Sequence, residues 1–275
     1  MCHTCVTESV KKKMLSRRDM FRSGAAVAAA GTAMAASGTV RALADGHLSG
    51  SVTDMTHTLE SAFPTYFGAP GFEADQTFNF ADNGFNLFNL AVNEHTGTHI
   101  DAPLHFSADG EAVDEIPVES LVVPLCVIDV REQAAENPDY RVTPDDVSAW
   151  MAEHGPMDEP CCVAMLSGWG EKTATDAFRN ADTDGVMHFP GFHIEASQKL
   201  REETGAVAMA VDTLSLDHGP SADFATHYDW LPTNRYGIEN LANLEQVPAS
   251  GATLVVGAPK HKGGSGGPAR IFALA

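Results

Sequence analysis

The stretch HTGTHIDAPLHF, residues 95–106, places three histidines and one aspartate at odd-numbered positions. In an extended strand successive side chains point to opposite faces, so His95, His99, Asp101 and His105 would share one face. In a helix Asp101 would point away from His95 and His99, because six residues rotate a side chain by about 600° in total. The sequence therefore predicts a strand with imidazole and carboxylate groups along one face.

The residues between these groups support a strand and limit its regularity. Thr98 and Ile100 are β-branched, and such residues favour extended backbone. Gly97 and Pro103 interrupt strands, so we expect a bulge or a sheet edge at this place.

Imidazole and carboxylate groups without thiolates are typical ligands of Zn²⁺ or Mn²⁺. We predict that His95, His99 and Asp101 bind such an ion, because three protein ligands leave open positions for water, as catalytic sites do. His105 follows Pro103 and is predicted to transfer protons. The alternative is a hydrogen-bonded polar strand without a metal.

The same stretch resembles the motif H-x-G-T-H-x-D-x-P-x-H of the metal-dependent cyclase family, the group of bacterial kynurenine formamidase and isatin hydrolase, at every fixed position. Other blocks of the chain are similar to later blocks of that family: DMTH (54–57), FPGFHIEA (189–196), VDTLSLD (211–217) and SGGPARIFAL (265–274). The resemblance implies a cyclase-like fold of the swivelling β/β/α type and a homodimer or larger homo-oligomer.

The resemblance also implies two further metal ligands, a histidine and a glutamate twelve residues later. His227 and Glu239 have this spacing in HYDWLPTNRYGIENL (227–241). Read without the family, they would be a loop histidine and an acid at a helix start. Because a carboxylate such as Glu239 can bridge two ions, we expect one or two Zn²⁺ or Mn²⁺ ions at a five-residue site. Its members are His95, His99, Asp101, His227 and Glu239.

The N-terminal segment has the features of a twin-arginine export signal. SRRDMFRSG (16–24) contains paired arginines, and an Ala-rich run and the cleavage-type sequence ALA (42–44) follow it. The run is too weakly apolar for a membrane span. We expect residues 1–44 to be a signal peptide read by the twin-arginine machinery and cleaved after Ala44, and residues 45–275 to be a periplasmic or secreted domain. The alternative is a basic N-terminal tail.

The charge and the cysteines restrict the partners and the redox chemistry. From residue 45 onward the chain has 10 basic and 35 acidic residues, which argues against nucleic acid and anionic membranes as partners. Cys126, Cys161 and Cys162 lie in or beside apolar runs and are predicted to be buried thiols. Cys2 and Cys5 lie upstream of the export signal, and we assign them no metal.

Strand and helix patterns alternate along the rest of the chain. Apolar runs predict strands over 50–59, 122–130, 161–170 and 206–217. Capping residues at the start and a glycine at the end predict two helices, over 143–155 and 193–205. Residues 252–275 are expected to form two strands around a Gly-rich turn that lets backbone approach the site. The pattern predicts an α/β domain with a mixed sheet or barrel-like core flanked by helices.

Two groups of residues have open roles. The loop 60–73, with Phe63, Tyr66 and Phe67, could form the wall of an aromatic substrate pocket or pack in the core. Asp212, Ser215 and Asp217 could orient metal ligands or form hydrogen bonds at a strand end.

These observations predict a metal-dependent hydrolase of a small aromatic amide, in which metal-bound hydroxide attacks the carbonyl carbon. An arylformamidase activity like that of kynurenine formamidase is the leading interpretation, and ring opening of a cyclic amide or lactone, as by isatin hydrolase, is the first alternative. The second is a non-catalytic periplasmic metal- or ligand-binding protein. The export signal and the sequence His218–Gly219–Pro220 depart from typical formamidases, so the substrate stays open.

Overall fold

A mixed nine-stranded sheet forms the core of the described part of the chain, residues 50–275 of a computed structural model. Its strands are β1 (Val52–Asp54), β4 (His99–Asp101), β5 (Val122–Asp129), β7 (Cys161–Leu166), β9 (Ala206–Val211), β10 (Tyr236–Glu239), β11 (Ala252–Gly257), β12 (Gly266–Pro268) and β13 (Arg270–Leu274). The predicted signal peptide, its paired arginines and the first two cysteines lie outside the described residues.

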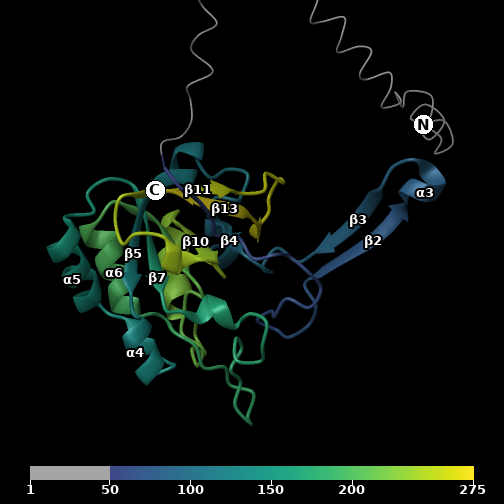
Figure 1. Cartoon of the computed structure of the whole chain (residues 1–275). Helices are drawn as coiled ribbons and strands as arrows, with labels where there is room; N and C mark the ends of the chain where they lie inside the picture. Colours follow the sequence, from purple (N-terminus) through teal and green to yellow (C-terminus); the bar gives the residue numbers. More distant parts are fainter. Residues whose placement is uncertain (1–49) are drawn as a thin grey trace, which may run out of the picture. The chain divides into compact units, whose positions relative to one another are not determined.

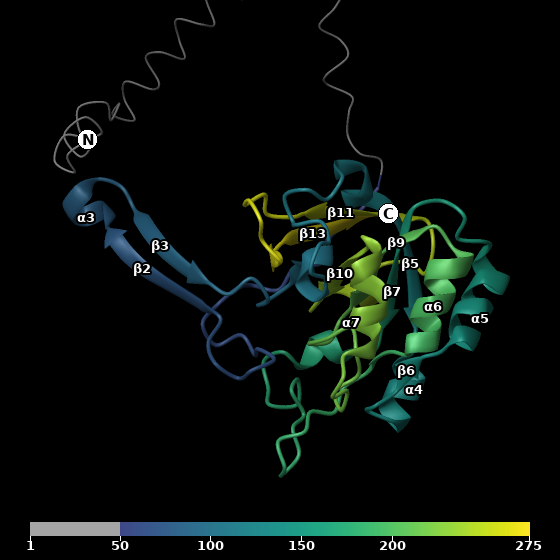
Figure 2. The ribbon, with the colours of Figure 1, turned by 180° about the vertical axis from the view of Figure 1, so that it is seen from behind.

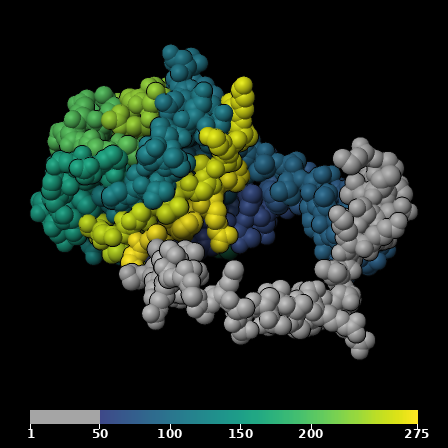
Figure 3. Space-filling view, turned by 90° about the horizontal axis from the view of Figure 1, so that it is seen from above, coloured from purple at the N-terminus to yellow at the C-terminus, as the bar shows by residue number. Residues whose placement is uncertain are grey.

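The strand order is β1-β13-β11-β5-β7-β9-β10-β4-β12 (Figure 1). Strands β5, β7, β9 and β10 run parallel in the middle, and antiparallel strands extend the sheet on both sides. The space-filling view shows the yellow C-terminal strands beside the blue-teal residues that lead into β5 (Figure 3). The short strand β4 therefore lies between β10 and β12, two segments far from it in the sequence.

The central strands are buried on both faces, as expected for parallel strands with near-continuous apolar sequences. In β5, Leu125 and Val127 belong to one hydrophobic cluster, while Cys126 and Ile128 belong to another. The second cluster also contains Trp150 of a covering helix. The period of two in the sequence thus divides the apolar side chains between two layers.

Helices α4 (Arg131–Glu136), α5 (Pro144–His154), α6 (Ile194–Glu203) and α7 (Ala225–Trp230) follow the central strands. Figure 2 shows α5 and α6 beside the parallel strands. The signals at the start of α5 act as predicted: the hydroxyl of Thr143 accepts from the backbone N–H of Asp146, the Asp146 carboxylate accepts in return, and Pro144 occupies the first turn.

Two pairs of strands lie outside the main sheet. Strands β2 (Phe72–Phe78) and β3 (Leu87–Val92) form a hairpin, and the short helix α3 (Phe80–Asn83) lies in the connection between them. Residues Ala74–Leu90 belong to a different compact unit from residues 50–73 and 91–275. The small strands β6 (Arg141–Val142) and β8 (Gly191–Phe192) pair in parallel. The hairpin has no counterpart among the strands predicted from the sequence.

The predicted α/β fold with a mixed sheet is confirmed, with shorter or additional strands at the ends. The strand expected over 50–59 is limited to β1, and the C-terminal segment contains three strands because β12 forms within the Gly-rich region. Cys126, Cys161 and Cys162 are buried free thiols, as predicted. Within residues 50–275 every helix is too short or too polar to cross a membrane.

Candidate metal centre

The histidine row is only partly a strand. Residues His99–Asp101 form β4, but His95 lies in a bend before it, because Gly97 adopts a φ of +64° that an extended strand does not allow. The prediction of a strand from His95 was therefore wrong for its first four residues. The side chains nevertheless converge, since His95 Nδ1 lies 2.7 Å from Asp101 Oδ1.

The alternation of faces holds from Thr98 onward. The hydroxyl of Thr98 donates to the backbone oxygen of Asn240 (2.6 Å) and accepts from the backbone N–H of His57 (2.9 Å). Ile100 is fully buried in the core. These contacts hold the face of β4 that carries Thr98 and Ile100, so His99 and Asp101 project from the opposite face.

Strand β10 supplies the residue opposite His99. In the antiparallel register Glu239 pairs with His99 and Gly237 pairs with Asp101. Glu239 Oε2 lies 3.4 Å from His99 Nε2. A Cβ atom at Gly237 would lie 3.3 Å from Asp101 Oδ2, so the glycine leaves room for that carboxylate.

Helix α7 adds His227 to the same cluster. Its Nε2 lies 3.2 Å from Glu239 Oε1 and 3.6 Å from Asp101 Oδ2. On the far side of the ring, Nδ1 lies 2.6 Å from Asp217 Oδ2. An imidazole held in this way keeps its proton on Nδ1, so Nε2 is the nitrogen that can bind a cation at the cluster.

All five predicted ligands therefore lie together, although they come from a bend, two strands and a helix. Potential ligand atoms form two groups in which all atoms lie within 4.8 Å of one another: His95, His99 and Asp101, and Asp101, His227 and Glu239. Asp101 belongs to both groups. Glu239, the expected bridging carboxylate, contacts one imidazole of each group.

The donor set fits a divalent cation. His99 Nε2 and Asp101 Oδ2 are buried atoms with no hydrogen-bond partner among the described residues. Unpaired buried polar atoms cost free energy, and a cation bound between them would remove that cost. Nitrogen and carboxylate oxygen without thiolate suit Zn²⁺ or Mn²⁺, as the sequence predicted.

The field of the cluster is strongly negative. Burial lowers the pKa of His99, but Asp101 and Glu239 outweigh burial and raise this pKa to about 10. Burial also acts against protonation of His227, yet Asp101, Asp217 and Glu239 raise its pKa well above the ordinary value. Carboxylates that retain protons on two buried imidazoles would equally attract a metal cation.

His105 lies beside the cluster but outside the strand. It belongs to a 3₁₀ turn, Pro103–Phe106, and its ring stacks on that of His95 with centroids 3.8 Å apart. Burial, together with the neighbouring His95 and His227, lowers the pKa of His105 to about 4. A neutral imidazole at the edge of the cluster can accept a proton.

A cavity of about 370 Å³ opens onto the cluster. Tyr66 and Phe67 of the 60–73 loop line it together with Phe106 and Phe224, so this loop forms part of the pocket wall. Phe63 instead packs in a hydrophobic cluster with Trp169 and Phe178, among others. Phe224 adopts a φ of +49°, which is uncommon for a bulky residue and places its ring 5.7 Å from those of Tyr66 and His227.

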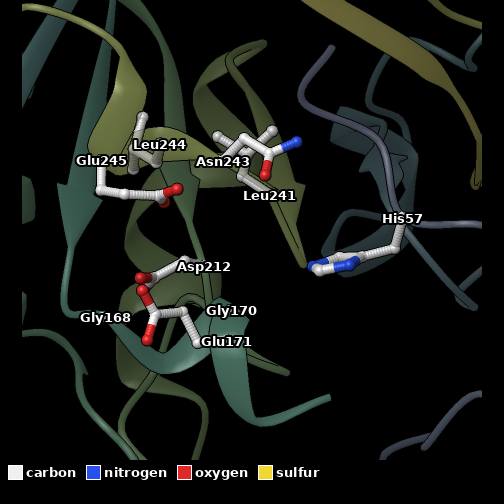
Figure 4. Close-up of a pocket in the computed structure, with 9 residues that line it drawn as sticks. All are labelled: His57, Gly168, Gly170, Glu171, Asp212, Leu241, Asn243, Leu244 and Glu245. Carbon is white, nitrogen blue, oxygen red and sulfur yellow. The ribbon is translucent and has the colours of Figure 1, made fainter. Parts of the chain in front are cut away.

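The residues with open roles divide between two sites. Asp217 orients His227, whereas Asp212 accepts hydrogen bonds from Ser167 and the backbone N–H of Trp169. Asp212 lines a second cavity of about 60 Å³, shown in Figure 4 with the side chains of Glu171, Glu245 and His57 around it. None of the predicted metal ligands lines this second cavity.

Sequence reasoning missed Ser265, which contacts the cluster from outside, and Glu94, which contacts Ser265. Ser265 Oγ lies 3.0 Å from His95 Nε2, and Glu94 Oε2 accepts from Ser265. Glu94 could have been noticed as an acidic residue directly before the histidine row. No local sequence pattern indicates its pairing with Ser265, which lies 171 positions later. Gly266 does bring backbone close to the site, as predicted, because a Cβ there would lie 2.8 Å from His95 Cε1.

Comparisons with known proteins agree with this geometry. The family described as "Putative cyclase" matches residues 53–218, a range that contains His95, His99, Asp101 and His105. Isatin hydrolase of Roseibium aggregatum is 34% identical over 205 residues, which cover 70% of this chain and 77% of that protein. Kynurenine formamidase of Salinibacter ruber is 29% identical, covering 70% of this chain and 81% of its own.

The solved structures give the same fold. Isatin hydrolase A from Labrenzia aggregata, bound to benzyl benzoate, superimposes with a TM-score of 0.77 and 36% identity, covering 82% of this chain and 93% of that one. An isatin hydrolase bound to the product analogue thioisatinate has the same TM-score at 28% identity and covers 95% of this chain.

Proposed function

This chain belongs to the cyclase family and is a metal-dependent hydrolase of C–N amide bonds, and from that premise we propose that its substrates are small, neutral aromatic amides. The observation that carries the proposal is the cavity beside the ligand cluster. Aromatic side chains line it, and none of the described residues that line it is lysine or arginine.

The wall of the cavity suits a flat ring. The rings of Phe106 and Phe224 lie 5.5 Å apart, and that of Tyr66 lies 5.7 Å from Phe224. Aromatic side chains at such separations offer offset or edge contacts to an aryl group. An aryl amide would thus bind with its ring against these residues and its amide at the cluster.

Cyclic amides are the first candidate class. N-formylkynurenine carries an ammonium and a carboxylate, and none of the described residues that line the cavity is a lysine or arginine that could pair with that carboxylate. A lactam such as isatin has no such charges, and the relative with 34% identity is an isatin hydrolase. Open-chain formanilides, the leading class from the sequence, are the second candidate because a kynurenine formamidase is also a relative.

In the proposed mechanism the five clustered residues hold the cation, and His105 moves the proton. When bound, a Zn²⁺ or Mn²⁺ ion lowers the pKa of water and polarises the amide carbonyl. His95, His99, Asp101, His227 and Glu239 present nitrogen and oxygen atoms to one ion or two. The neutral ring of His105 takes a proton from the attacking water and gives one to the departing nitrogen as the C–N bond breaks.

The test uses purified protein with and without metal. We expect chelator-treated protein to be inactive, and Zn²⁺ or Mn²⁺ to restore hydrolysis of isatin and formanilide, with N-formylkynurenine a poorer substrate. A His99→Ala variant should lose both the metal and the activity. Turnover by metal-free His99→Ala protein would refute the metal mechanism, and a preference for N-formylkynurenine would refute the neutral-substrate class.

We also propose that the chain is exported by the twin-arginine route and cleaved after Ala44. The paired Arg17 and Arg18 and the small residues 42–44 support this proposal. Changing both arginines to lysine should leave an uncleaved precursor inside the cell. Export and cleavage of that double variant would contradict the proposal. The homo-oligomer implied by the family resemblance also stays a prediction.

A further inference from the structure

A chain of hydrogen bonds leads from His95 to the surface. Ser265 Oγ lies 3.0 Å from His95 Nε2 and 2.6 Å from Glu94 Oε2. The other Glu94 oxygen, Oε1, lies 2.6 Å from Nε2 of His261, whose side chain is half exposed. Four residues from two segments of the chain, 94–95 and 261–265, are therefore connected in the order His95, Ser265, Glu94 and His261.

The donors in this chain have only one consistent arrangement. A carboxylate accepts and does not donate, so the single hydroxyl hydrogen of Ser265 is directed to Glu94. The Ser265 oxygen must then accept from His95, which places a proton on His95 Nε2. The Nδ1 atom of the same ring faces the cluster, 2.7 Å from Asp101 Oδ1, and donates to that carboxylate unless a bound cation replaces its proton.

The backbone holds this arrangement closely. The backbone N–H of Ser265 also donates to Glu94 Oε2. A Cβ atom at Gly264 would lie 2.7 Å from Glu94 Oε1, and one at Gly266 would lie 2.8 Å from the His95 ring. A side chain at position 264 would displace His261 or Glu94, and one at position 266 would meet the backbone oxygen of Ile100 as well as His95.

We propose that Ser265 and Glu94 are positioning residues that set the orientation and tautomer of His95, so that His95 binds the metal through Nδ1. His99 and His227 face the cluster with Nε2 instead, because their Nδ1 atoms pair with the Gly97 oxygen and with Asp217. A residue that fixes the ring of a metal-binding histidine through a hydrogen bond commonly contributes about 10- to 100-fold to metal affinity.

The first experiment measures metal affinity. Metal-free protein is titrated with Zn²⁺ and Mn²⁺ in competition with a chromophoric chelator. Ser265→Ala should weaken binding by about 10-fold or more. Glu94→Gln should weaken it less, since an amide oxygen still accepts from the serine, and His261→Ala least. Ser148→Ala is the matched control, because its hydroxyl also forms a hydrogen bond, to Pro144 on α5, far from the cluster in the sequence.

The second experiment reads the His95 proton directly. In the Co²⁺-substituted protein, proton NMR should show a slowly exchanging ring N–H for His95 that is lost in Ser265→Ala and retained in Ser148→Ala. Unchanged affinity in Ser265→Ala, or persistence of that signal, would overturn the proposal. If Ser265→Ala does not fold, Glu94→Ala supplies the same two readings, because it removes the acceptor of the Ser265 hydroxyl. The inference rests on the proposed metal site and not on the substrate, so a protein that binds metal but hydrolyses no aryl amide would refute only the proposed function.

Discussion

Asp217 Oδ2 lies 2.6 Å from His227 Nδ1 and holds that ring against the ligand cluster. The same carboxylate accepts from the backbone N–H groups of Thr226 and His227 at the start of α7. Burial acts to raise the pKa of Asp217, but the bond and charge of His227 outweigh it and lower this pKa. One ionised carboxylate thus fixes both the helix start and the ligand ring.

Asp217→Asn should weaken metal binding about 10- to 100-fold. Asparagine has one acceptor oxygen, so its amide N–H₂ group must face either His227 or the backbone donors of α7. Chelator competition measures the affinity, and urea unfolding checks that the variant is folded. Ser221→Ala is the control, because it removes 3.3 Å contacts to the other Asp217 oxygen and to Asp223 but leaves the bond to His227 in place. Equal affinity of Asp217→Asn and the parent protein would contradict this role.

Asp212 should make stability fall as pH rises. Burial raises the pKa of this carboxyl to about 6, although hydrogen bonds from Ser167 and Trp169 oppose the shift. The folded state therefore binds more protons than the unfolded state between pH values of about 4 and 6. The stabilising contribution is complete below the unfolded pKa and is lost as pH rises through the folded pKa.

The measurement compares urea unfolding of the parent protein and Asp212→Asn at several pH values. Between about pH 4 and pH 7 the parent should lose on the order of 2 kcal/mol relative to the variant, which cannot ionise at this position. The altered hydrogen bonds of asparagine add an offset that does not depend on pH. Parallel stability curves for the two proteins would show that Asp212 does not titrate in this range.

Tyr66 should contribute to binding through its ring. Its centroid lies 5.7 Å from that of Phe224 and 5.3 Å from that of Phe67, and all three residues line the cavity. Tyr66→Leu should raise KM for aryl amides about 3- to 10-fold, while Tyr66→Phe should have little effect. Phe80→Leu, at an exposed residue outside the cavity, controls for loss of an aromatic ring. Equal KM values for the leucine and phenylalanine variants would contradict the stacking role.

Elements with local signals were predictable from the sequence. Helix α5 begins where Thr143, Pro144 and Asp146 specify a cap and ends before Gly155, because these interactions involve residues only a few positions apart. The alternation in β5 likewise separates its two buried layers. The bend at Gly97 was harder to place, since a glycine can sit in a strand, a bulge or a left-handed turn.

The parts that could not be predicted depend on contacts between distant segments. His227 and Glu239 could be named only through the family resemblance, because α7 and β10 meet β4 through the sheet order. The pairing of Glu94 with Ser265 has the same origin. The hairpin residues Phe72–Phe78 and Leu87–Val92 pair locally, but the Asn83–Gly84 pair between them ends helix α3 within a longer connection and does not form a two-residue turn directly between the strands.

His105→Gln should separate proton transfer from metal binding. The His105 ring stacks on His95 but has no hydrogen-bond partner among the described residues, and its contacts with the cluster are ring contacts. Glutamine approximates its size and polarity but cannot accept and return a proton near neutral pH. The variant should therefore keep its full metal content while kcat/KM for isatin or formanilide falls about 10²- to 10⁴-fold.

Elemental analysis and steady-state kinetics measure the two quantities on one sample. His154→Gln, on the surface end of α5, controls for the substitution itself. If the activity of His105→Gln falls only in proportion to lost metal, His105 supports the site and another group moves the proton.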